Sequence, residues 1–172
     1  MHLAESQLDR STLPVAGAPF INETTDLLRA VNDRDFDALL AMGDEDFSTI
    51  EVDSVGGRTR VRTLPDWAPR LRRFFVLVEA LNATTDSEIT GYRAVETSEL
   101  GYSVVEFRQD VVGAAFIATF DCVATIIWRP SDDGWQEACW HCSVVDRQVV
   151  LPEPIDGQDS PTDHRADRGQ NA

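Results

Sequence analysis

The chain has 172 residues, enough for one domain with a substantial core, and 42% hydrophobic and 26% charged residues are ordinary for a globular protein. Its charge is unusual, because the chain has 30 acidic and only 15 basic residues, all of them arginine, which gives a formal net charge of −15. A surface of this charge repels nucleic-acid phosphates and anionic membranes, so we exclude both as bulk partners.

Several features predict a cytoplasmic protein. The first residues contain no basic segment followed by an apolar run, as a secretory signal would. No uncharged apolar stretch reaches the roughly 18 residues of a membrane span. Three cysteines form an odd set, which favours a reducing compartment over a disulfide framework.

Both ends of the chain differ in composition from its middle. Residues 1–18 have no apolar period, and residues 148–172 are acidic and rich in proline and aspartate. We therefore predict a disordered arm over 1–18, a folded domain over 19–147 and a disordered tail over 148–172.

The first part of the domain is predicted to be helical. From Pro19 the apolar residues recur at helical spacing, and a shorter helix is expected from Phe36 to a stop at Gly43. Residues 47–53 and 58–64 alternate like strands around a turn at Gly56 and Gly57. A third helix is expected after Asp66 as its cap, with one apolar stripe: Trp67, Leu71, Phe74, Phe75 and Val78.

After Asn82 the apolar period changes to two. Residues 87–97, 102–112, 115–129 and 135–145 read as four strands joined by short turns, which predicts an antiparallel meander. The turn near Gly101 suggests that Tyr92 lies beside Phe107 and Arg93 beside Glu106. Helices followed by a long sheet predict an α+β fold.

The segment Cys139-Trp140-His141-Cys142 has the spacing of a redox or zinc motif, but it lies in a predicted strand. Residues three apart in a strand point to opposite faces, so the two thiols cannot share a metal or form a disulfide. No helix begins here to activate a thiol, and Cys122 is the only further cysteine. We therefore expect no metal and no cofactor.

The same alternation predicts the faces of the last two strands. Glu137, His141 and Ser143 share one face of the last strand, and Trp140 lies on the other, mostly apolar face. Matching the mixed faces of both strands places Asp121 near Ser143 and diagonal to His141. An Asp–His pair would then lie on the surface that faces the helices, although a slip of one residue reverses this register.

Two segments resemble a known family. TDLLRAVNDRDFDALLAMGDEDFSTIEVDSVGGR resembles the opening of SnoaL-like domains of the nuclear transport factor 2-like superfamily, and ATIIWRPSDDGWQEACWHCS resembles their ending in His-x-Ser. The resemblance covers residues 19–147. It implies a cone-shaped roll, in which a strongly bent antiparallel sheet wraps around about three helices and leaves a pocket. It also implies homodimers through the outer face of the sheet, which an apolar face carrying Trp140 would suit.

The resemblance carries over few site residues. His141 and Ser143 match the closing His-x-Ser, whose histidine usually points into the cone, and Trp67 matches a wall position. The superfamily includes ketosteroid isomerases and polyketide cyclases, but neither the ketosteroid isomerase set nor the Asp–Arg–Asp set of limonene-epoxide hydrolases aligns here.

Six arginines lie within sixteen positions: Arg58, Arg60, Arg62, Arg70, Arg72 and Arg73. One interpretation is that they neutralise nearby acids of the first helices. The other is that they clamp a carboxylate at the pocket rim or bind an acidic partner.

Two functions remain open from the sequence. In the first, the cone binds a small, largely apolar molecule and performs isomerase, cyclase or dehydratase chemistry, with His141 as proton carrier and Asp121 orienting it. Trp67, Tyr92 and Phe107 would then form the apolar wall, with Ser143 as a further ligand contact. In the second, the cone is a non-catalytic ligand-binding or dimerisation module.

Overall fold

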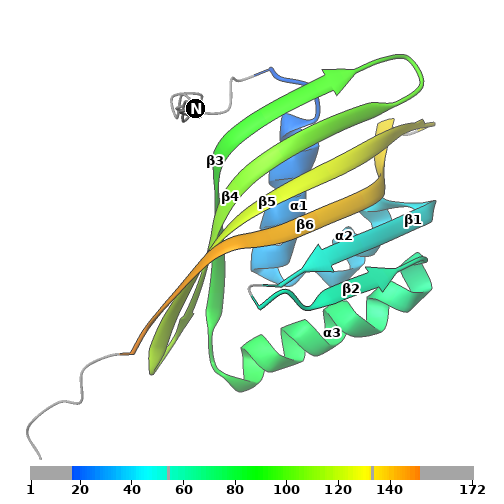
Figure 1. Ribbon diagram of the computed structural model, residues 1–172. Coiled ribbons are helices and arrows are strands. Elements are labelled where there is room, and N and C mark those ends of the chain that lie inside the picture. The colour runs from blue at the N-terminus through cyan, green and yellow to red at the C-terminus, as the bar shows by residue number, and fades with distance from the viewer. Residues whose placement is uncertain (1–16, 54, 133, 152–172) are drawn as a thin grey trace, which may run out of the picture.

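A computed structural model describes residues 17–53, 55–132 and 134–151, and these form three helices and one six-stranded sheet (Figure 1). The predicted arm over 1–18 and tail over 148–172 lie mostly outside the described residues, although the last strand continues to Val150, beyond the predicted end of the domain at 147. The elements are α1 (Ile21–Asp33), α2 (Phe36–Met42), β1 (Gly43–Val52), β2 (Arg58–Val61), α3 (Leu64–Ala80), β3 (Thr84–Glu96), β4 (Gly101–Gly113), β5 (Phe116–Ser131) and β6 (Gly134–Val150).

The sheet has the strand order β2-β1-β6-β5-β4-β3. All neighbouring strands are antiparallel except β1 and β6, which run parallel. Figure 1 shows the long strands β3 to β6 bending strongly, with the helices on the concave side. The predicted α+β cone is confirmed, with one parallel strand pair added to the expected antiparallel sheet.

The helices form where apolar residues recur on one side. In α1, Leu27 and Leu28 are buried against the sheet, as the period predicted. The cap of α3 differs from the prediction, because Thr63 is the N-cap. Its hydroxyl oxygen accepts a hydrogen bond from the Asp66 backbone N–H and donates one to the Asp66 carboxylate at 2.8 Å. Asp66 therefore serves as the reciprocal partner of the cap.

A bulge changes the register between β3 and β4. The ladder shifts between Ile89 and Gly91, so Phe107 pairs with Ile89 and Tyr92 pairs with Val105. The predicted neighbours Tyr92–Phe107 and Arg93–Glu106 are therefore wrong. β3 ends at Glu96, one residue before the predicted end at 97, and β4 begins at Gly101, one residue before the predicted start at 102. These two residues pair with each other.

A second bulge decides which side chains of β6 face the helices. Trp128 pairs with Glu137, whereas the preceding Ile127 pairs with Cys139, so Ala138 is the extra residue. The alternation changes phase there, and Glu137 lies on the inner face although His141 lies on the outer face. The prediction that these two residues share a face is wrong for this reason.

The inner face of the sheet is the apolar one. Cys122, Ala124, Ile126 and Trp128 of β5 are buried against the helices, and Trp140 faces inward beside them. The prediction that the mixed face of these strands lies toward the helices is therefore wrong. Burial of apolar area is the larger driving force, and it places the polar side chains on the outside.

Candidate functional site

The concave side of the sheet and the three helices line a cavity of about 400 Å³. Most of its wall is apolar or aromatic. The lining residues are Leu28 and Val31 of α1, Leu39 of α2, Trp67, Arg70, Leu71 and Phe74 of α3, and eleven residues of the sheet and the turn after β1: Phe47, Thr49, Glu51, Val52, Asp53, Phe107, Gln109, Cys122, Trp140, Cys142 and Val144. A volume of this size and an apolar wall are typical of small-molecule sites.

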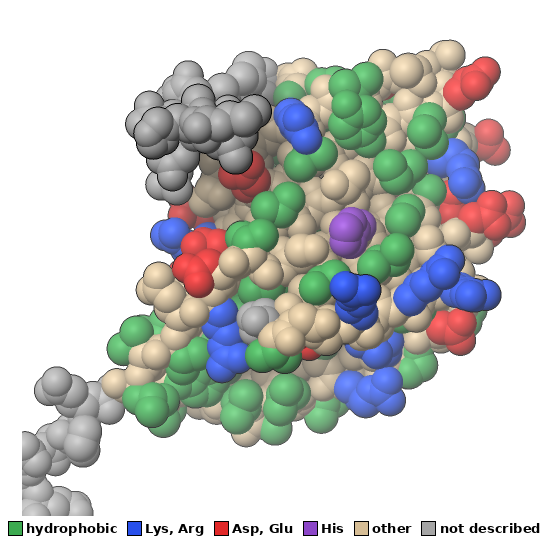
Figure 2. All heavy atoms as spheres, viewed as in Figure 1, with side chains coloured by type: hydrophobic (Ala, Val, Ile, Leu, Met, Phe, Trp, Pro, Cys, Tyr) green, Lys and Arg blue, Asp and Glu red, His purple; other side chains and the backbone are tan. Residues whose placement is uncertain are grey.

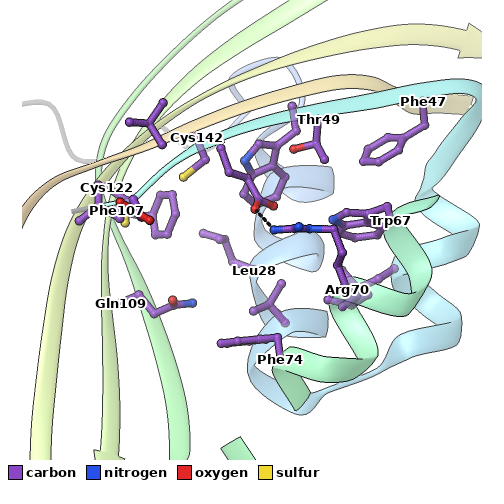
Figure 3. Close-up of a pocket in the computed structure, with 18 residues that line it drawn as sticks. Leu28, Phe47, Thr49, Trp67, Arg70, Phe74, Phe107, Gln109, Cys122 and Cys142 are labelled. Carbon is purple, nitrogen blue, oxygen red and sulfur yellow. Dashed lines mark ion pairs between the residues drawn. The ribbon is translucent and has the colours of Figure 1, made fainter. Parts of the chain in front are cut away.

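Arg70 supplies the positive charge of the cavity. Its guanidinium lies among the lining side chains (Figure 3), where Nη2 donates to the Thr59 hydroxyl at 3.1 Å and lies 3.7 Å from a carboxylate oxygen of Glu51. Both side chains of this ion pair are about two-fifths exposed. The pair is therefore loose and solvated, so its groups can exchange partners with a ligand.

Gln109 is the polar group on the β4 side of the cavity, and Figure 3 shows its amide directed inward. Its Nε2 donates to the Ser87 hydroxyl at 3.4 Å, and that hydroxyl donates to Asn32 Oδ1 at 2.9 Å. This chain of hydrogen bonds ties β4 through β3 to α1. It fixes the amide and leaves its carbonyl oxygen to accept a hydrogen bond.

Two cysteines meet in the wall. Cys122 and Cys142 come from neighbouring strands and are near-diagonal partners, since Cys122 pairs with Val144 and Cys142 with Ala124. The hydrogen bond to Cys122, together with burial, raises the pKa of the Cys142 thiol. A thiol held neutral in this way is a poor nucleophile, so this pair forms part of the wall.

The sequence-predicted residues divide into two groups. Trp67 and Phe107 line the cavity. Tyr92 does not: its hydroxyl donates to the Pro19 carbonyl at 2.7 Å and lies 3.4 Å from the Thr24 hydroxyl oxygen. Burial raises the pKa of this phenol, and the residue serves to fix the start of α1 on β3.

The predicted Asp–His pair is not assembled. His141 is exposed and pairs across β5 with Thr125, whereas Asp121 pairs with Asp146 and accepts a hydrogen bond from Arg108 Nε at 3.1 Å. Ser143 pairs with Val123, on the same outer face as His141. A histidine side chain is visible on the surface in Figure 2. The catalytic roles predicted for His141 and Asp121 thus lose the contact on which they depended.

Sequence reasoning missed the polar groups that do face the cavity. Arg70 lies three residues after Trp67 and four before Phe74, within the stripe that predicted α3. This spacing places all three on one side of the helix, so the signal was present in the sequence. Glu51 lies in the first strand, and the alternation of that strand does not show which of its two faces is buried.

A second polar centre lies outside the cavity. Glu137 is 1% exposed, and its Oε1 has no hydrogen-bond partner among the described residues. Burial, with a smaller contribution from the nearby Asp44 carboxylate, raises the pKa of Glu137 to about 8. Arg129 contacts Asp44 and lies 3.2 Å from Asp46, so the guanidinium is shared between these two acids. With a pKa of about 8, Glu137 is mainly protonated at neutral pH.

Two features are absent from the part of the chain that the structure describes. No group of three or more His, Cys, Asp or Glu side chains is placed to hold a metal ion there. None of the described helices is long and apolar enough to cross a membrane.

Comparison with solved structures finds this arrangement of elements at low sequence identity. ActVI-ORFA from Streptomyces coelicolor is 14% identical over 78% of this chain and 93% of its own, with a TM-score of 0.59. The beta subunit of benzoate 1,2-dioxygenase from Burkholderia mallei is 10% identical over 70% and 85%, with a TM-score of 0.61. A nuclear transport factor 2-like protein from Streptomyces avermitilis, described as a candidate dehydratase, is 17% identical over 72% and 91%, with a TM-score of 0.56. No protein-family model and no curated protein matches the chain. At these identities the likeness establishes the fold alone.

Proposed function

Because the chain has the nuclear transport factor 2-like fold, we propose that it binds a small, largely apolar organic molecule inside the cone. The observation that carries this proposal is the cavity of about 400 Å³ with its mainly apolar wall. In a cavity of this kind, burial of apolar area supplies the binding free energy, and a few polar groups orient the ligand. Arg70, Glu51 and Gln109 supply those groups here.

A reaction of isomerase, cyclase or dehydratase type is the catalytic version of this proposal. In it, the proton carrier is a carboxylate of the cavity, and Glu51 is the better placed one because Arg70 lies beside it. His141 lies on the opposite face of the sheet. The alternative is a non-catalytic ligand-binding module, which needs the cavity and no carboxylate.

The cavity can be tested by filling it. Val144→Phe adds a ring to a half-buried wall position, and we expect the affinity for N-phenyl-1-naphthylamine, an apolar fluorescent probe, to fall about tenfold or more. Titration of the probe by fluorescence measures the affinity. Circular dichroism and thermal unfolding show whether the variant is folded.

The matched control is the neighbouring residue. Val145 is 63% exposed and does not line the cavity, so Val145→Phe makes the same change outside it. We expect Val145→Phe to bind the probe as the unchanged protein does. Equal affinity in all three proteins would place the probe elsewhere and contradict the proposal.

We also propose that two copies associate through the outer face of the sheet. Trp140 points inward and takes no part in this face. Apolar side chains are grouped there instead, across β1, β3, β4 and β5: Ile50, Val95, Tyr102, Val104 and Ile127. The cytoplasmic location stays a prediction, and the three free cysteines are consistent with a reducing compartment.

Native mass spectrometry reports this association together with any co-purified ligand. We expect a dimer from the unchanged protein and a monomer from Tyr102→Glu, because two new carboxylates would face each other across the interface. Val112→Glu, at the far end of the same strand, should remain dimeric. A monomer in all three proteins would contradict the proposed interface.

A further inference from the structure

Five exposed arginines lie on β2, on α3 and in the link between them, where Figure 2 shows blue side chains gathered on the lower right of the molecule. We name Arg58, Arg60, Arg62, Arg72 and Arg73 the arginine belt. Arg70, the sixth arginine of this segment, belongs to the cavity. Residues 58–73 carry a net charge of +5, because Asp66 is their only acid, and the rest of the chain carries −20. The belt is therefore a positive site on a strongly negative molecule.

The belt is not neutralised by its neighbours. None of the five arginines makes an ion pair with a described acidic residue. The nearby acids have other partners: Asp53 accepts hydrogen bonds from the backbone N–H groups of Val55 and Gly57, and Asp66 accepts one from Thr63. Of the whole cluster, Arg70 alone makes an ion pair among the described residues, and its partner Glu51 belongs to β1 and not to the first helices. The guanidinium of Arg72 lies over the Phe36 ring, 4.3 Å from its centroid, and those of the other four arginines remain available to a partner.

β2 also offers backbone hydrogen bonds. It is the edge strand of the sheet and pairs with β1 on one side only, among the described residues. Arg60 lies opposite the exposed Ile50, and Arg58 is two residues away on the same strand, so both arginines stand on the outer face of the sheet. Thr59 and Val61 point the other way, toward α3. The free edge therefore presents positive charge at every second residue.

We propose that the belt binds an acidic protein segment in extended conformation, which adds to the free edge of β2 as a further strand. Side chains directly opposite each other on neighbouring strands lie within about 5.5 Å, so carboxylates at alternate positions would meet Arg58 and Arg60. Arg62 continues this row, and Arg72 and Arg73 extend the positive surface along α3. Nucleic acid has the same sign of charge as the segment, but the net −15 of the whole chain repels a long polyanion.

The test measures binding of two fluorescein-labelled peptides to the full chain by anisotropy. One peptide alternates glutamate and valine, and the other has the same composition in two blocks. We expect the alternating peptide to bind more tightly, with an affinity that falls as salt is added. The double variant Arg58→Gln, Arg60→Gln should weaken its binding roughly fivefold or more.

The control variant removes the same number of positive charges at positions outside the belt. Arg93→Gln with Arg147→Gln removes two exposed strand arginines outside the belt, and its affinity should stay within about twofold of the unchanged protein. Equal losses in both double variants would overturn the proposal, because binding would then follow net charge alone. Equal binding of the two peptides would overturn strand addition. Tighter binding of single-stranded RNA, or of vesicles containing phosphatidylserine, would overturn the class of partner.

Discussion

We expect the unchanged protein to lose stability as pH rises from about 4.5 to 8, and the Glu137→Gln variant to lose much less over the same range. The pKa of this buried carboxyl is about 8 in the folded protein and near its ordinary value of 4.5 in the unfolded chain. Within that window the folded state holds a proton that the unfolded state has released. The free energy of unfolding therefore falls as pH rises through the window and levels off above pH 8.

The size of the effect follows from the shift and amounts to a few kcal/mol over the full window. Glutamine keeps the shape of the side chain and stays neutral, so its stability does not depend on this proton. At low pH we expect the variant to be the less stable protein, because its amide N–H groups gain no partner in the site of Oε1. At high pH the order should reverse.

Urea unfolding at several pH values measures both curves. Asp44, Asp46 and Arg129 are the charged groups beside Glu137, and they are present in both proteins. Glu106→Gln, at an exposed position of β4, is the matched control and should follow the unchanged protein. Parallel curves for Glu137→Gln and the unchanged protein would mean that Glu137 is ionised in the folded state.

The fold could be predicted because its signals are local. The stripe from Trp67 to Val78 defines α3, and the period-two alternation after Asn82 defines four strands whose turns fix their order. The parallel pairing of β1 with β6 could not be read in this way. It joins residues about 90 positions apart, and no turn between them specifies the register.

Bulges in the long strands limited the prediction of the site. Extra residues near Thr90, at Ala138 and at Val145 leave the composition of each strand unchanged but move side chains to the other face or to new neighbours. His141 and Asp121 share a face of the sheet, as the alternation predicts, but it is the outer face, because the apolar face of β5 packs against the helices. They also lie apart, since Asp121 pairs with Asp146 and His141 with Thr125. Arg70 was visible in the helical stripe, but it was grouped with the other arginines by sequence distance instead of by helical side.

Gly101→Ala is expected to lower the free energy of unfolding by about 2 kcal/mol or more, because Phe20 occupies the space of the new methyl group. A Cβ at Gly101 would overlap the Phe20 ring. That ring is 4% exposed, stacks on Trp128 at 5.5 Å between centroids and meets the edge of Trp135 at 5.0 Å. The ring is held on three sides, so it cannot move aside without losing these contacts.

A double-mutant cycle separates this overlap from other effects of the methyl group. Phe20→Ala alone should cost about 3–5 kcal/mol, since it empties the space between the two indoles. In that background Gly101→Ala should cost less than about 1 kcal/mol, and the difference is the coupling between the two positions. Gly91→Ala is the control on β3, where the new methyl group meets the exposed, movable side chain of Glu106. Additive losses at Phe20 and Gly101 would show that the ring does not require the glycine, and that the contact between the start of α1 and the start of β4 is looser than its geometry indicates.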